Sequence, residues 1–509
     1  MASEARRTTR AVATFDPIPS RRVAADLAVE VSGAAPPGAT AVAVAVGTDG
    51  PIPDRLGLGR AALTAAGFTG AVGQALAIPG DATPELVVVG IGDPADLGTA
   101  SLRDAGAAFA RATYRHASIA ATLGELPGVD PASAAQAVVE GVLLARYRYR
   151  AFRDQPGEAV LETLTLVADD ATADAVRAGA GRCRITAEAV WLGRDLANTP
   201  PMHLSATRMA EIAQVVGGQA GLAVEVFDHD ALVELGCGGL LGVNAGSGEP
   251  ARMVRLTYRP AGEPTGHLAL VGKGIMYDAG GISLKPSDAM HAAMKLDMSG
   301  AAAVLASMTT LRALDCRALV TGYLMCTDNM PSGTAMRLGD VLTIRGGKTV
   351  EVFNTDAEGR LVMADGIVLA TEQGADAIVT IATLTGAAMR TFGEVYAAVL
   401  GNDPGLVAQL RVAGDAADEP AWELPLVRKY RRQLDSKIAD IRNMGGINAG
   451  TITAGLFLEE FTAGTPFGHL DICGPMMTDV DDSWRSVGAT AFGTRLLIEL
   501  ALGFRTPAA

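Results

Sequence analysis

The sequence contains few of the residues that build disulfide frameworks, thiolate metal sites or nucleophile triads. It has five cysteines and six histidines among 509 residues. The cysteines are scattered and odd in number, which is typical of reduced, buried thiols and argues against a disulfide framework. No Gly-x-Ser-x-Gly segment is present, so a serine hydrolase triad is not expected. We therefore predict a cytoplasmic protein whose chemistry uses other residue types.

Excess positive charge and long apolar runs are also missing. The formal net charge is −14, which argues against a general role in binding nucleic acids or other polyanions. No stretch approaches about 18 uninterrupted apolar residues, so we predict no membrane span. Residues 1–20 contain arginines without a following apolar run, and they are not expected to be a signal peptide.

Short apolar runs alternate with helical stretches along the whole chain, and 49% of the residues are hydrophobic. This pattern predicts an α/β protein of two domains, each a mixed or mostly parallel sheet flanked by helices. We expect an N-terminal scaffold or oligomerisation domain at residues 1–178, a linker helix at 179–198 and a catalytic domain at 199–509. The strands expected in the first domain are 41–46, 86–91 and 163–167, and its helices include 105–113 and 134–149.

The catalytic domain is expected to contain more strands than the first. Its predicted helices are residues 205–217 and 298–313, and its predicted strands are 252–258, 268–272, 318–325, 349–354, 377–382 and 467–471. The helix that begins at 298 is rich in small residues and could pack tightly beneath the sheet.

Ionisable residues gather in residues 354–361, NTDAEGRL. The alternation at 348–353 predicts a strand and the apolar run at 361–370 a helix, so Asp356, Glu358 and Arg360 should lie on the connection, where open α/β sheets bind ligands. In an extended segment, residues two apart point the same way. Two converging carboxylates repel each other unless a cation lies between them. That cation could be Arg360, in a loop salt bridge, or a metal ion.

A second group of ionisable residues lies upstream and favours the metal ion. The strand near 268–271 is followed by Lys273, Asp278, Lys285 and Asp297, with paired glycines at 280–281 that suggest backbone folded closely around a ligand. Residues 272–274 lack the spacing of a phosphate-binding P-loop, so nucleotide binding is not expected.

Several of these segments resemble the leucyl aminopeptidase (cytosol aminopeptidase) family. The likeness covers roughly residues 190 to 500, and its segments occur in the family's order: 271–274 (VGKG), 278–287 (DAGGISLKPS), 295–298 (KLDM), 329–333 (NMPSG), 354–361 (NTDAEGRL), 382–387 (ATLTGA) and 469–472 (HLDI).

The resemblance implies a two-metal peptidase that releases N-terminal residues, of leucine type and broad, from peptides. The residues that match the family's metal ligands are Lys273, Asp278, Asp297, Asp356 and Glu358. Asp278 and Glu358 would bridge the ions, Lys285 and Arg360 would be catalytic, and bicarbonate would be held by Arg360 and the backbone near Leu384. The residues that match the substrate site are Met294, Asn354, Thr383 and Gly386. The resemblance further implies a homohexamer.

The chemistry of the matched residues agrees with this assignment. A set of oxygen ligands with one nitrogen suits Zn²⁺ or Mn²⁺, with Mg²⁺ or Co²⁺ as further options. Two such ions roughly 3.5–4 Å apart can share a water, lower its pKa to near 7 and clamp an oxyanion. Lys273 could bind an ion only as a neutral amine, whereas Lys285 would stay charged and stabilise the oxyanion.

The sequence departs from the family pattern at three places, none of which is a proposed ligand. The gap from Lys285 to Asp297 is one residue longer, Ile447 replaces a common basic residue, and Thr380 replaces a common acid. In the lengthened segment His291 is a candidate to touch substrate, whereas His469 is expected to be structural. Three alternatives stay open: a second role in nucleic-acid binding, which the acidic chain does not favour, an inactive structural or oligomeric homologue, and a two-metal hydrolase that acts on phosphoesters.

Overall fold

The computed structural model describes residues 15–78, 84–122, 126, 128–153 and 157–507. The described residues form two compact units. The N-terminal unit consists of residues 19–191 with 478–488, and the catalytic unit, named after the domain expected there, consists of residues 15–18, 192–477 and 489–507. The division falls within helix α5 (Ala173–Asn198), which continues without a break through the expected linker. Residues 478–488 were expected in the catalytic domain, whereas the structure places them in the N-terminal unit.

The N-terminal unit contains a six-stranded sheet of order β1-β6-β5-β2-β4-β3, parallel except for β3. Its strands are β1 (Ala28–Ser32), β2 (Ala41–Val46), β3 (Ala75–Ala77), β4 (Glu85–Gly90), β5 (Ser118–Ala121) and β6 (Thr163–Val167), and its helices are α1 (Ser20–Asp26), α2 (Arg60–Ala65), α3 (Thr99–Ala112) and α4 (Pro131–Arg146). The predicted strands are confirmed at β2 and β6 and shifted by one residue at β4.

Segment 478–488 runs from the end of β18 (Met477–Thr478) to the start of β19 (Gly488–Ala489) and belongs to this unit. It forms ion pairs with two arginines of the unit. Asp481 pairs with Arg111 and with Arg148, each at 2.7 Å. These contacts join residues more than 300 positions apart, which no local sequence pattern indicates.

The catalytic unit contains an eight-stranded mixed sheet of order β15-β14-β17-β13-β9-β10-β8-β7. Its strands are β7 (Ala223–Phe227), β8 (Arg252–Tyr258), β9 (His267–Asp278), β10 (Leu319–Asn329), β13 (Ala377–Ala382), β14 (Ala397–Gly401), β15 (Ala421–Glu423) and β17 (Phe467–Asp471). The four central strands β17, β13, β9 and β10 are mutually parallel, so their carboxyl ends meet at one edge.

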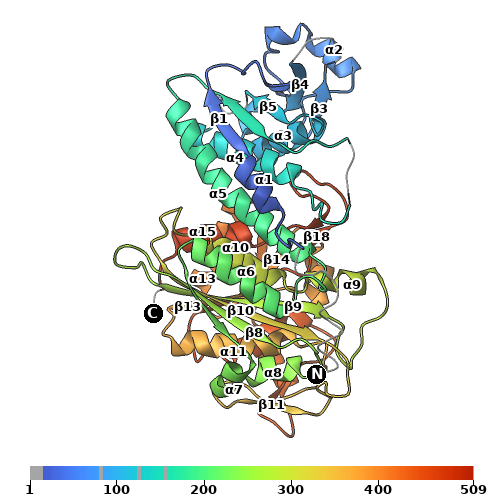
Figure 1. Cartoon of the computed structure of the whole chain (residues 1–509), viewed down its shortest axis with the longest axis vertical. Coiled ribbons are helices and arrows are strands. Elements are labelled where there is room, and N and C mark those ends of the chain that lie inside the picture. Colours follow the sequence, from blue (N-terminus) through green and yellow to red (C-terminus); the bar gives the residue numbers. More distant parts are fainter. Residues whose placement is uncertain (1–14, 79–83, 123–125, 127, 154–156, 508–509) are drawn as a thin grey trace. The chain divides into compact units, whose positions relative to one another are not determined.

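Helices cover both faces of this sheet (Figure 1). One face carries α6 (Ala206–Gln219), α10 (Ser299–Met308), α13 (Pro404–Ala417) and α15 (Thr494–Gly503); the other carries α8 (Gly238–Asn244), α11 (Gly359–Glu372) and α14 (Gly450–Glu459). The remaining helices are α7 (His229–Leu235), α9 (Ala289–Ala292) and α12 (Gly386–Phe392). Buried apolar residues of β9, such as Val271 and Ile275, pack with Leu361 and Val362 of α11 in the main core. The expected small-residue helix is α10, which packs on β9 and β10.

The strand expected at 349–354 is shorter and lies in a different sheet. It is β12 (Thr349–Glu351), the middle strand of a small sheet with β11 (Val341–Thr343) and β16 (Ile441–Arg442). The expectation that residues 354–361 follow a strand of the open sheet was therefore wrong. They follow the small sheet and reach the main one through α11, which packs on β9.

Among the residues that the structure describes, no helix is both long enough and apolar enough to cross a membrane.

Candidate metal centre and substrate cavity

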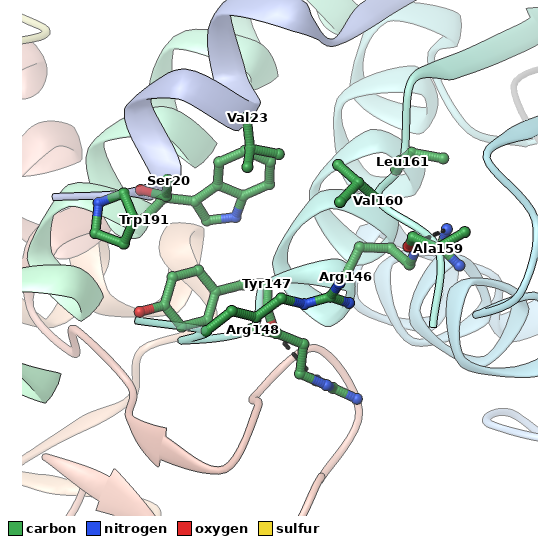
Figure 2. Close-up of a pocket in the computed structure, with 11 residues that line it drawn as sticks. Ser20, Val23, Arg146, Tyr147, Arg148, Ala159, Val160, Leu161 and Trp191 are labelled. Atoms are coloured by element: carbon green, nitrogen blue, oxygen red, sulfur yellow. Dashed lines mark hydrogen bonds between the residues drawn. The ribbon is translucent and has the colours of Figure 1, made fainter. Parts of the chain in front are cut away.

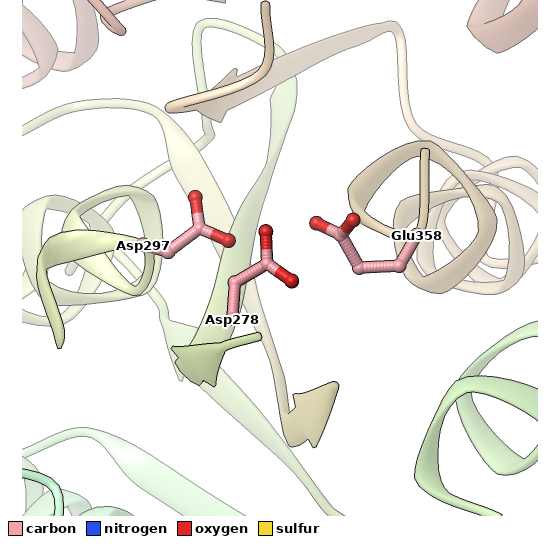
Figure 3. Close-up of side chains that lie close together, drawn as sticks. All are labelled: Asp278, Asp297 and Glu358. Atoms are coloured by element: carbon pink, nitrogen blue, oxygen red, sulfur yellow. The ribbon is translucent and has the colours of Figure 1, made fainter. Parts of the chain in front are cut away.

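Three carboxylates from separate elements converge in the catalytic unit (Figure 3). Asp278 ends β9, Asp297 lies just before α10 and Glu358 caps the start of α11. All three are buried, and each offers an oxygen within 4.8 Å of the others. Their convergence is the arrangement that divalent cations with oxygen ligands require.

A β-bulge in β9 brings Lys273 to the same side as Asp278. Between the pairs Ile275 with Thr327 and Asp278 with Asn329, β9 contains one residue more than β10. Five residues apart, Lys273 and Asp278 would face opposite sides of a regular strand, and the extra residue reverses that alternation. The bulge thus completes a cluster that alternation alone would split.

Two lysines neutralise part of the cluster. Lys273 Nζ lies 2.8 Å from Asp297 Oδ2 and 2.7 Å from Glu358 Oε1. Lys285 Nζ lies 2.8 Å from Asp278 Oδ2 and 2.6 Å from Asp356 Oδ1. Four carboxylates thus face two ammonium groups, so the cluster has fewer cationic groups than carboxylates.

The pKa values of the cluster reflect burial and this crowding. Burial, together with Asp278, raises the pKa of Glu358 to about 8 despite the opposing effect of Lys273. Burial also raises the pKa of Asp297 to about 6, although Lys273 acts to lower it, and burial raises the pKa of Asp356. Burial alone would lower the pKa values of both lysines, but the surrounding carboxylates outweigh it and raise them. The cluster therefore favours any added positive charge.

Neighbouring groups hold the carboxylates in place. Asp278 Oδ1 accepts hydrogen bonds from Asn329 Nδ2 and from the Gly280 backbone, both at 2.8 Å. Thr383 Oγ1 donates to Asp297 Oδ1 at 2.6 Å. Asn354 Oδ1 accepts from the Asp356 backbone at 2.7 Å. Asn329 was not predicted to be a site residue, although it belongs to the segment 329–333 that resembles the family.

Two glycines allow this close packing. Gly280 has a φ of +86°, and a Cβ there would lie 3.0 Å from Asp356 Oδ1. A Cβ on Gly359 would lie 2.5 Å from Lys273 Cε. Any larger residue at these positions would displace the loop or the lysine that the cluster uses.

The segment 354–361 reaches the site by a turn and not by extended backbone. Asp356 lies in a turn and Arg360 in the first turn of α11, so the expected alternation is wrong, although Asp356 and Glu358 do converge. Arg360 is buried and is not among the residues that line the cavity. Its Nη1 donates a hydrogen bond to the Asn443 carbonyl at 2.8 Å. Burial lowers its pKa to about 10, against the effects of Glu358 and Asp471.

The cluster opens into a cavity of about 400 Å³, a volume typical of small-ligand sites. Of the predicted substrate residues, Met294, Thr383, Leu384 and Gly386 line it, whereas Asn354 does not. His291 of the lengthened segment also lines the cavity. His469 does not line it; it is buried, and its ring nitrogen Nδ1 lies 2.8 Å from Thr380 Oγ1. Further lining residues not predicted are Pro286, Asp288, Met290, Met389, Arg390, Cys473 and Met476.

A second pocket lies in the N-terminal unit (Figure 2). It is mainly apolar, lined by Trp191, Tyr147 and Val23 among others, and holds only about 80 Å³. The guanidinium of Arg146 at this pocket already donates to the backbone carbonyls of Thr113 and His116. This pocket is too small for a peptide and its lining has no ligand set for a metal, whereas the cavity of the catalytic unit has both the volume and the carboxylates.

Comparisons with known proteins agree with this location. The model described as "Cytosol aminopeptidase family, catalytic domain" matches residues 191–498, and "Cytosol aminopeptidase family, N-terminal domain" matches residues 55–156. A probable cytosol aminopeptidase of Streptomyces avermitilis is 41% identical over 459 residues, covering 87% of this chain and 88% of that protein. One of Leifsonia xyli is 40% identical over 467 residues, covering 87% and 90%.

Solved structures give the same picture. The structure titled "Bottromycin maturation enzyme BotP in complex with Mn" matches with a TM-score of 0.83 and 37% identity, covering 91% of this chain and 99% of that chain. The resemblance noted in the sequence is thereby confirmed. The chain belongs to the cytosol aminopeptidase family and is an aminopeptidase.

Proposed function

We propose that the cluster binds two divalent metal ions and that the enzyme uses them to release N-terminal residues from short peptides. The observation that carries this proposal is the convergence of Asp278, Asp297 and Glu358, buried and within 4.8 Å of one another. Membership of an aminopeptidase family favours peptides over phosphoesters as substrates.

The residues present fit such ions. Glu358 Oε2 is buried and accepts no hydrogen bond from any described residue, so one oxygen of the cluster is free to bind a cation. The excess of carboxylates over ammonium groups favours added positive charge. The residues that would hold the ions are Lys273, Asp278, Asp297, Asp356 and Glu358. The carboxylates raise the pKa of Lys273, and Lys273 would become a neutral ligand only when bound cations take over the carboxylates that now favour its charge. Bound there, two divalent ions would polarise the scissile carbonyl and activate water for attack.

The chain's own residues would position the substrate and stabilise developing charge. Lys285 is the more exposed of the two lysines, with 19% of its side chain accessible against 3% for Lys273. Its ammonium group can therefore face both the cluster and a peptide carbonyl, as an oxyanion donor must. Asp356 is also partly exposed, at 35% of its side chain, and it keeps that ammonium oriented through the contact at 2.6 Å.

Finer features of the family extend the proposal. The relative solved with Mn supports Mn²⁺ as one of the ions, with Zn²⁺ as the alternative. Bicarbonate near Arg360 is supported by that residue's Nε, which lacks a hydrogen-bond partner among the described residues. We also propose a homohexamer, which the family resemblance implies, and a cytoplasmic location, which the scattered and odd-numbered cysteines favour.

Hydrolysis of aminoacyl anilides tests the function directly. Purified protein is stripped with a chelator and refilled separately with Zn²⁺, Mn²⁺, Mg²⁺ or Co²⁺. Activity should vanish on stripping and return with metal, on free-amine but not N-acetylated substrates. Asp356→Ala should lose both metal and turnover, while the exposed Glu263→Ala keeps them. Normal metal content and rate in Asp356→Ala would refute the assignment.

A further inference from the structure

A cavity of about 250 Å³ lies within the N-terminal unit, apart from the metal centre, and arginines line much of it. Its charged lining residues are Arg111, Arg146, Arg148, Arg150, Glu158 and Asp481. Four guanidinium groups therefore face two carboxylates, which leaves an excess of two positive charges. We propose that this space, the arginine cavity, binds a small oxyanion with the charge and shape of a phosphate group.

The sequence RYRYR at residues 146–150 explains how three of these arginines reach one space. Arg146 ends α4, and the next residue, Tyr147, has an extended backbone with φ −61° and ψ 133°. Side chains two apart on an extended backbone point the same way. Arg146, Arg148 and Arg150 all line the arginine cavity, whereas the intervening Tyr147 lines only the apolar pocket of Figure 2.

Two of the arginines have N–H groups that no described acceptor takes. Arg150 donates from Nη2 to Glu158 at 3.1 Å, and no described residue accepts from its Nε or Nη1. Nη1 of Arg111 is buried and lies 2.7 Å from Asp481, yet it makes no hydrogen bond within the described chain. These groups can donate to an anion in the cavity without breaking an existing hydrogen bond.

The other two arginines are held in place by contacts within the unit. Arg146 donates to the Thr113 carbonyl at 2.6 Å. Arg148 contacts Asp481 through Nη2 at 2.7 Å and donates from Nη1 to Ser486 Oγ at 3.1 Å. Their charges are therefore fixed beside the available donors before an anion arrives, so binding does not have to order these side chains.

Burial and mutual repulsion disfavour the charges of these guanidinium groups. Burial lowers the pKa of Arg146 to about 10; Glu158 opposes this shift, whereas the two neighbouring arginines add to it. Burial also lowers the pKa of Arg111, and Arg148 adds to that shift although nearby carboxylates oppose it. A bound anion would stabilise all of these charges at once.

Phosphate suits the cavity in charge, geometry and size. Guanidinium groups bind phosphate through paired N–H donors, and a phosphate dianion matches the excess of two positive charges. The formal net charge of −14 disfavours a long polyanion. The apolar pocket of Figure 2 shares Arg146, Arg148 and Arg150 with the arginine cavity, so an organic phosphate can place a small apolar group there. The two sources are therefore free phosphate and a phosphate monoester.

Isothermal titration calorimetry of the full-length protein distinguishes these sources. Sodium phosphate and phenyl phosphate are titrated at about pH 8, where each carries close to two negative charges. Sodium chloride keeps the ionic strength constant. We expect saturable binding of at least one of them, with a Kd of about 1 mM or below. Phenyl phosphate that binds at least as tightly as phosphate identifies a monoester, and tighter binding of phosphate identifies the free ion. Absence of saturable binding for both would overturn the inference.

Two substitutions with opposite effects assign the binding to the arginine cavity. Arg150→Gln removes available donors and should weaken binding by about 10-fold or more, as the loss of a charged hydrogen bond does. Glu158→Gln removes a competing carboxylate and should tighten binding. Both side chains are partly exposed, at 31% for Arg150 and 24% for Glu158, so the fold should persist.

The matched control is Arg177→Gln. Arg177 lies on α5, is exposed and does not line the arginine cavity, so this variant should bind the anion as the wild type does. An affinity that is unchanged in Arg150→Gln would mean that the anion binds elsewhere in the protein, and it would overturn the inference even if phosphate binds.

Discussion

Glu358→Gln should separate the stability of the fold from its affinity for metal. The substitution keeps the size of the side chain and makes it neutral at every pH, whereas Glu358, with a pKa of about 8, is only partly ionised near neutral pH without metal. It ends the repulsion between Glu358 and the nearby Asp278 and replaces the ion pair of Glu358 with Lys273, at 2.7 Å, by a hydrogen bond to a neutral amide, while Lys273 keeps its contact with Asp297 at 2.8 Å. Because replacing a crowded buried charge by a neutral isostere is often neutral or stabilising, we expect the metal-free variant to unfold no more easily than the wild type.

Metal should distinguish the two proteins clearly. At a Mn²⁺ concentration of about 100 times the Kd, binding at one site stabilises the wild type by about 2.7 kcal/mol. If losing the carboxylate weakens binding about 100-fold, the same concentration gives about 0.4 kcal/mol. For a unit of this size about 1 kcal/mol shifts the Tm by roughly 2 °C, so the expected shifts are about 5 °C and below about 1 °C.

Differential scanning fluorimetry with and without Mn²⁺, at fixed protein concentration, measures both effects. The exposed Glu263→Gln serves as the matched control and should respond as the wild type does. An equal Mn²⁺ shift in Glu358→Gln would show that Glu358 does not bind the ion. A metal-free variant that unfolds about 10 °C earlier would show that the carboxylate stabilises the fold, contrary to the charge argument.

Three further changes test other parts of the site. Lys285→Met should lower kcat by about 10² to 10³ while metal content, measured by plasma mass spectrometry, stays at the wild-type level; loss of metal would mean that the two lysines have the opposite roles. Asn329→Leu removes the donor 2.8 Å from Asp278 and should weaken Mn²⁺ binding by about 10- to 100-fold in calorimetry; an unchanged Kd would rule out an orienting role. Burial raises the pKa of Asp365 to about 7, so the folded state binds this proton more tightly than the unfolded state, and stability should fall by up to about 4 kcal/mol as pH rises from about 4 to 7. Asp365→Asn should lack that contribution in urea unfolding across this range; an identical pH dependence would contradict it.

The sequence predicted the short apolar strands best. The run AVAVAV and the run AIVTIA are short, apolar and flanked by polar residues or glycine, and β2 and β13 have the expected limits. The strand at β12 was predicted too long because Val352 and Phe353 extend its strand-favouring run after β12 has ended at Glu351. Strand β14 was missed, since its pairing with β17 is antiparallel and long-range.

The sequence predicted the residue types of the site. Where the side chains of Lys273, Asp278 and Arg360 lie, however, depends on contacts with residues distant in sequence. Lys273 and Asp278 share a side only because β9 has an extra residue relative to β10. Arg360 matches the family motif, yet its guanidinium is held by the Asn443 carbonyl, 83 residues away. A motif therefore identifies the chemistry, whereas the side on which each group lies follows from bulges and partners distant in sequence.

The cavity wall follows a rule that could have been applied to more of the chain. Strands β9, β13 and β17 are parallel neighbours, with Ile381 beside Gly272 and Ala382 beside Asp471. Their carboxyl ends must open on one edge, so the loops after them must line one site, whatever their sequences. Arg390 and Cys473 lie on two of those loops or just beyond. Residues without any motif can thus be assigned to the substrate cavity by strand order alone.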